Sequence, residues 1–159
     1  MLDNDQNNAN HLLLLRAEID EPAYRKLIRI CTDALPDEAC GVLASSHSDS
    51  LSHGAVRIDT VYPIRNAAQE KAHVFSFEPR EWIGAYFSML KNRQTLVGFY
   101  HSHPLAPPVP SSADIAGIRY STAMTYWIVS LADPDQPHIQ AYQVSGNSFV
   151  PLMFAQVSV

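Results

Sequence analysis

Two histidines separated by one residue are the first feature of this chain that could do chemistry. His101 and His103 follow an apolar run, and Pro104 comes directly after them. Because side chains alternate along an extended strand, both imidazoles would lie on one face, close enough to bind one metal ion. Asp114 stands eleven residues after His103, at the start of a predicted helix. Two imidazole nitrogens and one carboxylate oxygen are a usual ligand set for catalytic zinc, with a fourth position left for water.

A metal-dependent hydrolase also needs a group that takes a proton from the attacking water, and Glu38 is the candidate. Glu38 lies between a predicted helix that ends at Pro36 and a predicted strand that begins at Gly41. It could project from a strand end, but spacing alone does not place it opposite the histidines. With seven histidines in 159 residues, an accidental H-x-H pair is expected in roughly a third of such chains, so the pair alone also fits two surface histidines.

Three other chemically capable side chains have simpler explanations. His73 precedes a predicted strand over 74–77, so we expect a strand-edge histidine, with the lining of a substrate channel as the alternative. Cys31 falls on the apolar stripe of a predicted helix and is assigned to the core. Cys40 stands two residues after Glu38 and is interpreted as a small buried residue rather than a nucleophile. None of the three is given a catalytic role.

Hydrophobic periodicity predicts the helices that surround these residues. A first helix is expected over 22–35, between two prolines. A second begins at Pro79, and its expected buried face consists of Trp82, Ile83, Tyr86, Phe87 and Leu90. A short third helix is expected from a cap at Ser111 or Ser112 to about residue 120.

Apolar and alternating segments predict the strands. They cover residues 12–19, 41–44, 55–64, 74–77, 96–100, 126–132, 139–144 and 149–157. Strands interspersed with helices in this way predict an α+β fold, in which a mixed, mostly antiparallel β-sheet is flanked by helices.

The composition predicts a single domain. A chain of 159 residues with 47% hydrophobic content can bury one proper core and is too short for two comfortable ones. Residues 1–11 are rich in Asn and Asp without periodicity, so we expect a flexible N-terminal tail there and one domain over 12–159.

Charge and hydropathy argue against two classes of partner. Eleven Lys and Arg against sixteen Asp and Glu give a net charge of −5 without a basic stripe, which disfavours nucleic-acid binding. No apolar run approaches the roughly 18 residues that cross a bilayer. The polar start MLDNDQNNANH does not read as a secretory signal, so we expect a cytoplasmic protein.

Taken together, the candidate residues resemble the signature of the JAMM, or MPN-plus, metalloproteases. That signature is a glutamate, then His-Ser/Thr-His, seven residues, a serine, and an aspartate three positions later. Its positions are occupied by Glu38, His101, His103, Ser111 and Asp114. The likeness covers roughly residues 12–145 and is greatest to compact stand-alone bacterial and archaeal members. It implies a JAMM/MPN fold with a cytidine-deaminase-like architecture.

The resemblance also implies a role for each motif residue. His101, His103 and Asp114 would bind one Zn²⁺ per chain. Glu38 would hold and deprotonate the zinc-bound water and then pass its proton to the leaving amine. Ser111 would donate a hydrogen bond to the oxyanion of the tetrahedral intermediate.

The same resemblance suggests a substrate. Eukaryotic ubiquitin-specific relatives carry a long insertion after the motif, whereas only ten residues separate Asp114 from Thr125 here, and no cysteine follows Cys40. This favours hydrolysis after the C-terminal Gly-Gly of a ubiquitin-like or sulfur-carrier protein, whose extended tail could be held by strand addition. A homodimer is compatible with the sequence.

Two alternatives come from other functional classes. Many MPN relatives are non-catalytic scaffold or interaction subunits, but those typically lack one or more of the ligands that this chain retains. A zinc deaminase would need H-x-E and P-C-x-x-C motifs, which this chain lacks.

Overall fold

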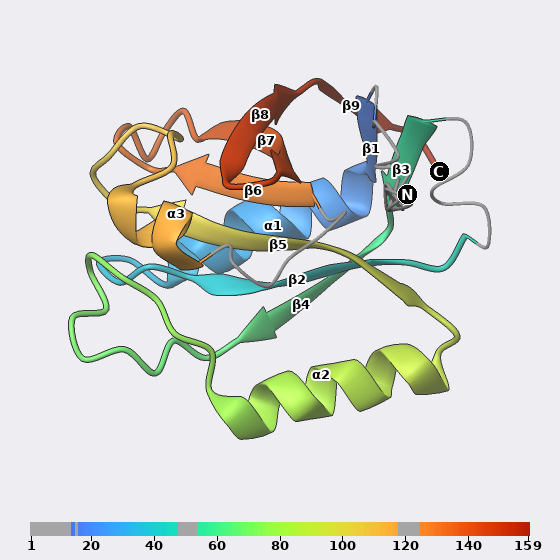
Figure 1. Cartoon of the computed structure of the whole chain (residues 1–159), viewed down its shortest axis with the longest axis horizontal. Helices are drawn as coiled ribbons and strands as arrows, with labels where there is room; N and C mark the ends of the chain where they lie inside the picture. The colour runs from blue at the N-terminus through green and yellow to red at the C-terminus, as the bar shows by residue number, and fades with distance from the viewer. Residues whose placement is uncertain (1–13, 15, 48–53, 118–124) are drawn as a thin grey trace, which may run out of the picture.

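The computed structural model describes residues 14, 16–47, 54–117 and 125–159, so the predicted tail over 1–11 lies outside the described residues. The described chain forms a twisted sheet with a long helix on either side (Figure 1). Its helices are α1 (Glu21–Asp33), α2 (Pro79–Lys91) and α3 (Ser112–Gly117). Its strands are β1 (Arg16–Asp20), β2 (Cys40–Ser45), β3 (Ala55–Ile58), β4 (Thr60–Ile64), β5 (Thr95–His103), β6 (Thr125–Ser130), β7 (His138–Ser145), β8 (Ser148–Leu152) and β9 (Phe154–Val157).

Most of the strands belong to a sheet in the order β4-β2-β5-β6-β7-β8. All neighbours in this sheet are antiparallel except β5 and β6, which are parallel. A second sheet, β3-β1-β9, is parallel throughout. The mixed, mostly antiparallel sheet flanked by helices is therefore confirmed. Because parallel neighbours need a crossover, the chain leaves the end of β5 and passes through α3 before it returns in β6.

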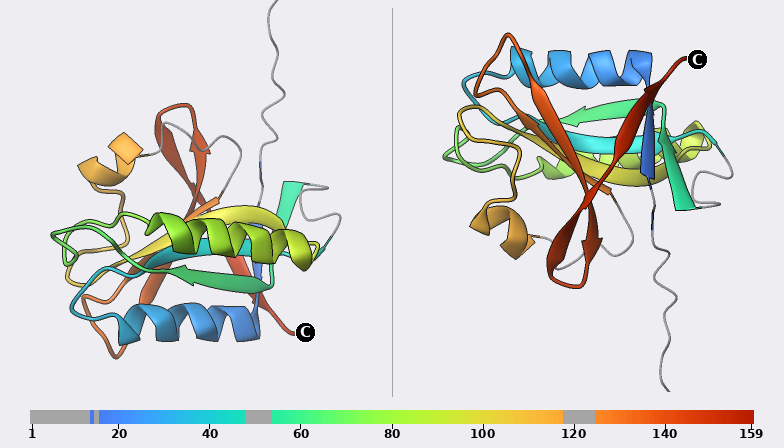
Figure 2. Two further views of the ribbon diagram at one scale, coloured as in Figure 1. Left: turned by 90° about the horizontal axis from the view of Figure 1, so that it is seen from below. Right: turned by 90° about the horizontal axis from the view of Figure 1, so that it is seen from above.

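The two long helices cover opposite faces of the six-stranded sheet (Figure 2). α1 buries Leu27 and Cys31 in a core shared with Leu43 of β2, whereas Val42 and Ala44 on the other face of β2 pack in the cluster under α2. This alternation is what an extended strand between two covering layers requires. None of the helices in the described residues has the length and apolar character needed to cross a bilayer.

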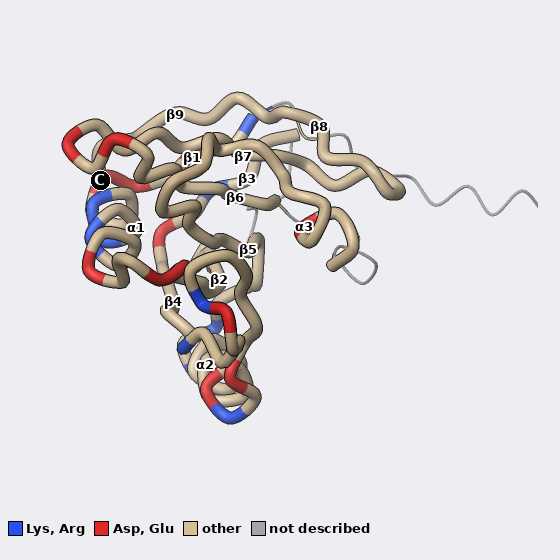
Figure 3. The backbone as a smooth tube through the Cα atoms, turned by 90° about the vertical axis from the view of Figure 1, so that its left-hand side faces the viewer, with Lys and Arg blue, Asp and Glu red and all other residues tan. Residues whose placement is uncertain are grey.

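The predicted buried face of the second helix is wrong. Four of its five residues are exposed, at 54%, 46%, 64% and 54% for Ile83, Tyr86, Phe87 and Leu90 respectively. α2 instead contacts the sheet through Ala85 and Met89, with Trp82 half-buried beside them. Apolar residues surround much of this helix, so periodicity could not select the narrow face that packs. Figure 3 shows α2 projecting from the rest of the molecule, which leaves most of its circumference uncovered.

Two substitutions in α2 should distinguish the observed face from the predicted one. Met89 is 2% exposed, so Met89→Ala should lower the free energy of unfolding by about 2–5 kcal/mol through lost contacts and a residual cavity. Phe87→Ala removes a side chain that remains largely in water and should change it by less than about 0.5 kcal/mol. Urea denaturation followed by circular dichroism measures both values. A larger loss of unfolding free energy in Phe87→Ala than in Met89→Ala would support the predicted face instead.

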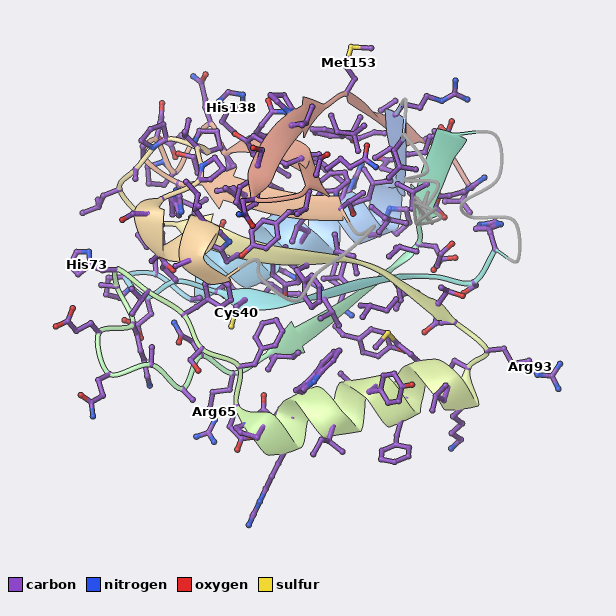
Figure 4. The ribbon with its side chains drawn as sticks, viewed as in Figure 1. Cys40, Arg65, His73, Arg93, His138 and Met153 are labelled. Atoms are coloured by element: carbon purple, nitrogen blue, oxygen red, sulfur yellow. The ribbon has the colours of Figure 1, made fainter. Side chains whose placement is uncertain are left out.

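Two long predicted strands are each divided because the chain changes sheets. The segment 55–64 breaks at Asp59, so that β3 pairs with β1 while β4 pairs with β2. The segment 149–157 breaks at Met153, so that β8 pairs with β7 and β9 with β1. Met153 points away from the molecule at this junction (Figure 4). Apolar residues occur on both sides of each break, which is why the sequence predicted single strands.

The predicted strand over 74–77 is also wrong. Within this segment only Phe77 forms a bridge, to Asn66. Backbone groups of Val74 and Ser76 bond to the side chain of Asn66 instead of to a neighbouring strand. The strand predicted over 12–19 is observed from Arg16, with 12, 13 and 15 outside the described residues, as is the predicted helix beyond Gly117.

Candidate metal centre and active site

The two histidines lie at the carboxyl end of the central strand β5. In the ladders on either side of β5, His101 is opposite Cys40 of β2 and Ile128 of β6. The two imidazole Nε2 atoms are 2.9 Å apart, so the rings share one face as the alternation predicted. Both side chains are buried. Their positions are therefore set by a strand that is hydrogen-bonded on both edges.

The crossover after β5 brings Asp114 to the same point. Its Oδ1 lies 3.1 Å from His101 Nε2, and its Oδ2 lies 3.4 Å from His103 Nε2. The ligand atoms of the three buried residues all lie within 4.8 Å of one another, as in a group that could hold one metal ion. Two imidazoles and a carboxylate match the protein ligands of a catalytic zinc site, so the donor chemistry fits this ion.

Surrounding groups orient the two rings. His103 Nδ1 lies 2.8 Å from the carbonyl oxygen of Pro107, and a proton on Nδ1 would leave the lone pair of Nε2 available to a metal. The ring of Phe75 stacks on that of His101 with centroids 4.7 Å apart. Among the described residues, His101 Nδ1 has no hydrogen-bond partner.

The Ser-x-x-Asp part of the motif forms a reciprocal cap at the start of α3. Asp114 N–H donates to Ser111 Oγ at 3.1 Å, and Ser111 N–H donates to Asp114 Oδ2 at 2.7 Å. This is the arrangement of a capping box, with Ser111 as the N-cap. The Ser111 hydroxyl acts here as an acceptor, so its own hydrogen can still donate to another group.

Glu38 approaches the histidines because Ser102 holds the chain next to it. Ala39 N–H donates to Ser102 Oγ at 2.8 Å, and Ser102 N–H donates to Ala39 O at 3.0 Å. Glu38, His73, His103 and Ser111 line one cavity of about 130 Å³, and Glu38 is only 6% exposed. The structure thus places the predicted base, one predicted metal ligand and the predicted oxyanion donor at one cavity. The sequence motif contained Ser102 without indicating its role, although alternation places it on the face opposite the histidines.

The charges at the site are strongly perturbed. Burial raises the pKa of Glu38 from its usual 4.5 to about 7, with Asp114 adding to the increase and His103 opposing it. Burial also opposes charge on Asp114, but hydrogen bonds from both histidines outweigh it and hold the pKa of this carboxyl well below its usual range. Burial lowers the pKa of His101. Burial has the same effect on His103, but bonds to Asp114 and Pro107 outweigh it and raise its pKa.

The raised pKa of Glu38 predicts a pH-dependent stability in protein stripped of metal. The pKa of Glu38 in the folded state lies above its value in the unfolded state. The contribution of Glu38 to the free energy of unfolding is therefore present at pH 4 and is lost as the pH rises through about 7. Replacement by the neutral isostere in Glu38→Gln should therefore stabilise the stripped protein at pH 8, by about 1–2 kcal/mol, and have little effect at pH 4.5. Urea midpoints at the two pH values test this. An advantage of Glu38→Gln at pH 4.5 only would show that the sign is wrong.

The structure shows where His73, Cys31 and Cys40 lie. His73 lies in a turn rather than at a strand edge, near α3 (Figure 4). It borders the cavity that holds Glu38 and a neighbouring one lined by Asp114. The alternative, that His73 lines a substrate channel, stays a prediction. Cys31 and Cys40 are buried as predicted, and burial raises the pKa of both thiols to about 12.

Comparison with known proteins identifies the family. Residues 20–145 match the family of prokaryotic homologs of the JAB domain. This match spans most of the chain, and the chain therefore belongs to that family.

Relatives and solved structures agree with this assignment. The chain is 30% identical over 120 residues to a desampylase of Haloferax volcanii, covering 76% of this chain and 78% of the relative. It is 28% identical over 109 residues to a CysO-cysteine peptidase of Mycobacterium tuberculosis, covering 69% of each. A Desulfitobacterium hafniense protein solved in solution has a TM-score of 0.78 and 26% identity over 90% of this chain and 94% of its own. A JAB1/MPN domain protein from Archaeoglobus fulgidus shares the fold, with a TM-score of 0.54 and 16% identity over 87% of this chain and 99% of its own.

Proposed function

We propose that this chain is a zinc-dependent peptidase or isopeptidase that hydrolyses the bond after the C-terminal Gly-Gly of a ubiquitin-like or sulfur-carrier protein. The observation that carries the proposal is that Glu38 and Ser111 line one cavity with His103. His103 in turn belongs to the candidate ligand group that includes His101 and Asp114. Relatives named as a desampylase and a CysO-cysteine peptidase support this substrate class.

The chain would divide the chemistry between the metal and Glu38. When bound by His101, His103 and Asp114, zinc supplies a Lewis acid that activates water at neutral pH and polarises the scissile carbonyl. Glu38 accepts the proton of the attacking water and then delivers it to the leaving amine. Burial opposes the charged form of Glu38, which favours the uptake of the proton that it then passes to the amine.

Ser111 would stabilise the charge that develops on the carbonyl oxygen. Its hydroxyl is fixed by the Asp114 N–H and lines the same cavity as Glu38. A donor held in place before the reaction stabilises an oxyanion without having to reorganise.

The substrate tail would lie next to the segment 74–77. The Phe77 bridge to Asn66 is the only pairing of this segment with a strand-like neighbour among the described residues. Phe75 and His73 border the site. An extended Gly-Gly tail could add to such a segment through backbone hydrogen bonds, and a narrow path would admit only glycine.

A single cleavage experiment tests the proposal. The zinc-loaded protein is incubated with a ubiquitin-like fusion ending in Gly-Gly-X, and the products are followed by mass spectrometry. We expect cleavage directly after the second glycine, and its loss on chelation. A protein that holds well under one zinc per chain, cleaves no such fusion and still binds a partner tightly would instead be a scaffold subunit.

Ser111→Ala should lower kcat by about 10²–10³-fold, the cost of removing one oxyanion donor. Zinc content should stay near one per chain because Ser111 is not a ligand. Ser112→Ala removes a hydroxyl one residue away and serves as the matched control, with kcat within about threefold of the wild type. Equal losses in the two variants would contradict a specific role for the Ser111 hydroxyl as oxyanion donor.

A further inference from the structure

Asn66 is a buried amide that makes an unusual number of contacts beside the site. It lies two residues after the end of β4 and is 8% exposed. Its side-chain nitrogen donates to the carbonyl oxygens of Glu38 and Val74, both at 3.0 Å, and lies 3.4 Å from that of Lys71. Its side-chain oxygen accepts from the N–H groups of Ala68 at 3.0 Å and Ser76 at 3.1 Å. The amide thus uses both its donor and its acceptor on backbone groups.

These bonds shape the whole segment 66–78. Ala67 N–H donates to Ser76 O and Glu78 N–H donates to Arg65 O, so the segment returns along itself around Asn66. The closed segment carries His73, which lines the cavity of Glu38, and Phe75, which stacks on His101. The wall of the candidate active site is therefore organised by one side chain.

The same segment holds the backbone of Glu38 on both sides. Glu38 N–H donates to Lys71 O at 2.7 Å, and Glu38 O accepts from Asn66. The N–H and carbonyl groups of the next residue, Ala39, both bond to Ser102, which lies between the two histidines of β5. Glu38 precedes β2 and has no ladder partner there, so these contacts replace the sheet in fixing its backbone.

From this geometry we propose that Asn66 is a positioning residue, which fixes the backbone of Glu38 relative to the metal ligands and to the wall that carries His73 and Phe75. The catalytic part of this inference rests on the proposed function, because it takes Glu38 as the group that moves the proton. Asn66 is neither in the ligand group nor among the residues that line the cavity shared by Glu38 and His103. It lines a separate cavity, which Glu38 also borders. Its effect passes through Glu38.

Asparagine suits this position because one side-chain amide carries both the donors and the acceptor that the surrounding backbone groups require. Aspartate keeps the acceptor for Ala68 and Ser76 but presents an oxygen to the carbonyls of Glu38 and Val74. Alanine loses both sets of bonds. The two variants therefore separate the contact with Glu38 from the closure of the segment.

The kinetic test compares Asn66→Asp, Asn66→Ala and the control Asn147→Asp, which makes the same chemical change in the exposed β7–β8 turn. We expect Asn66→Asp to lower kcat by about 10- to 100-fold with KM within about threefold, because the base is displaced while the wall persists. Asn66→Ala should lower kcat similarly and also raise KM. The control should match the wild type. Wild-type kcat in Asn66→Asp would overturn the proposal.

Hydrogen exchange of the zinc-loaded proteins gives a readout that does not depend on activity. Exchange over residues 36–40 should be faster in both variants, whereas exchange over 67–76 should be faster chiefly in Asn66→Ala, since Asn66→Asp keeps the acceptor for Ala68 and Ser76. Zinc content should stay near one per chain. If Asn66→Ala does not fold, Asn66→Asp, which is nearly isosteric, decides the question.

The two proposals can fail separately. If the wild-type protein cleaves no Gly-Gly fusion, the proposed function fails, while the exchange pattern still shows whether Asn66 holds Glu38. If the wild type is active but exchange over 36–40 is unchanged in both variants, Asn66 does not position Glu38.

Discussion

Glu38→Gln in the zinc-loaded protein should lower kcat by about 10²–10⁴-fold, the range expected for loss of a general acid–base group. Glutamine has nearly the same shape but cannot accept the proton of the attacking water. Because His101, His103 and Asp114 form the ligand group without Glu38, zinc content should stay near one per chain. KM should change little, since the walls of the cavity are retained.

The control for this prediction is Glu70→Gln, the same chemical change at an exposed position of the neighbouring segment. Initial rates with the Gly-Gly fusion and zinc analysis of the same samples give both quantities. Cleavage by Glu38→Gln at the wild-type rate would exclude Glu38 as the proton carrier, even if the reaction still required metal.

Removal of the metal should abolish cleavage altogether. A chelator should reduce the rate to background, and added Zn²⁺ should restore it, because the activated water and the polarised carbonyl both depend on the ion. Asp114→Asn should produce the same loss, and added Zn²⁺ should not reverse it. The amide lacks the negative charge of the one carboxylate ligand, and its N–H groups repel a cation. Zinc content of this variant should fall well below one per chain.

Asp135→Asn is the matched control, since Asp135 is exposed in the turn between β6 and β7. It should retain both zinc and activity. An Asp114→Asn protein that binds zinc and cleaves as the wild type does would remove Asp114 from the ligand group. Cleavage that persists after the metal has been stripped would refute the metallopeptidase proposal as a whole.

The sequence predicted the sheet well where a strand is buried on both faces. The apolar run before His101 corresponds to β5, and the alternation of His101 and His103 placed both rings on one face. The sequence failed where tertiary pairing decides the outcome. Nothing in the local pattern at Asp59 or Met153 indicates that the chain leaves one sheet for the other, and the apolar surface of α2 does not show which side meets the sheet.

The site was predictable to the extent that a motif defines it. Residue types and spacing indicated Glu38, Ser111 and the three ligand residues. Asn66 was not predicted, since a single asparagine after a strand is an ordinary turn signal. Its contacts with Glu38 and Val74 depend on how the chain returns to β2, which no spacing rule contains.

The three candidate ligands are unevenly distributed between the central sheet and a connecting segment. Two belong to β5 in the middle of the sheet, and the third lies eleven residues further along, in the crossover. A bound ion would therefore act as a cross-link that closes a short ring of chain, and the entropy lost by so small a ring is modest. Unlike a zinc finger, which cannot fold without its ion, this molecule has a sheet and two apolar layers whose buried residues, in the described part of the chain, lie outside 103–114. A bound ion would therefore link the crossover, through Asp114, to the central strand of the sheet.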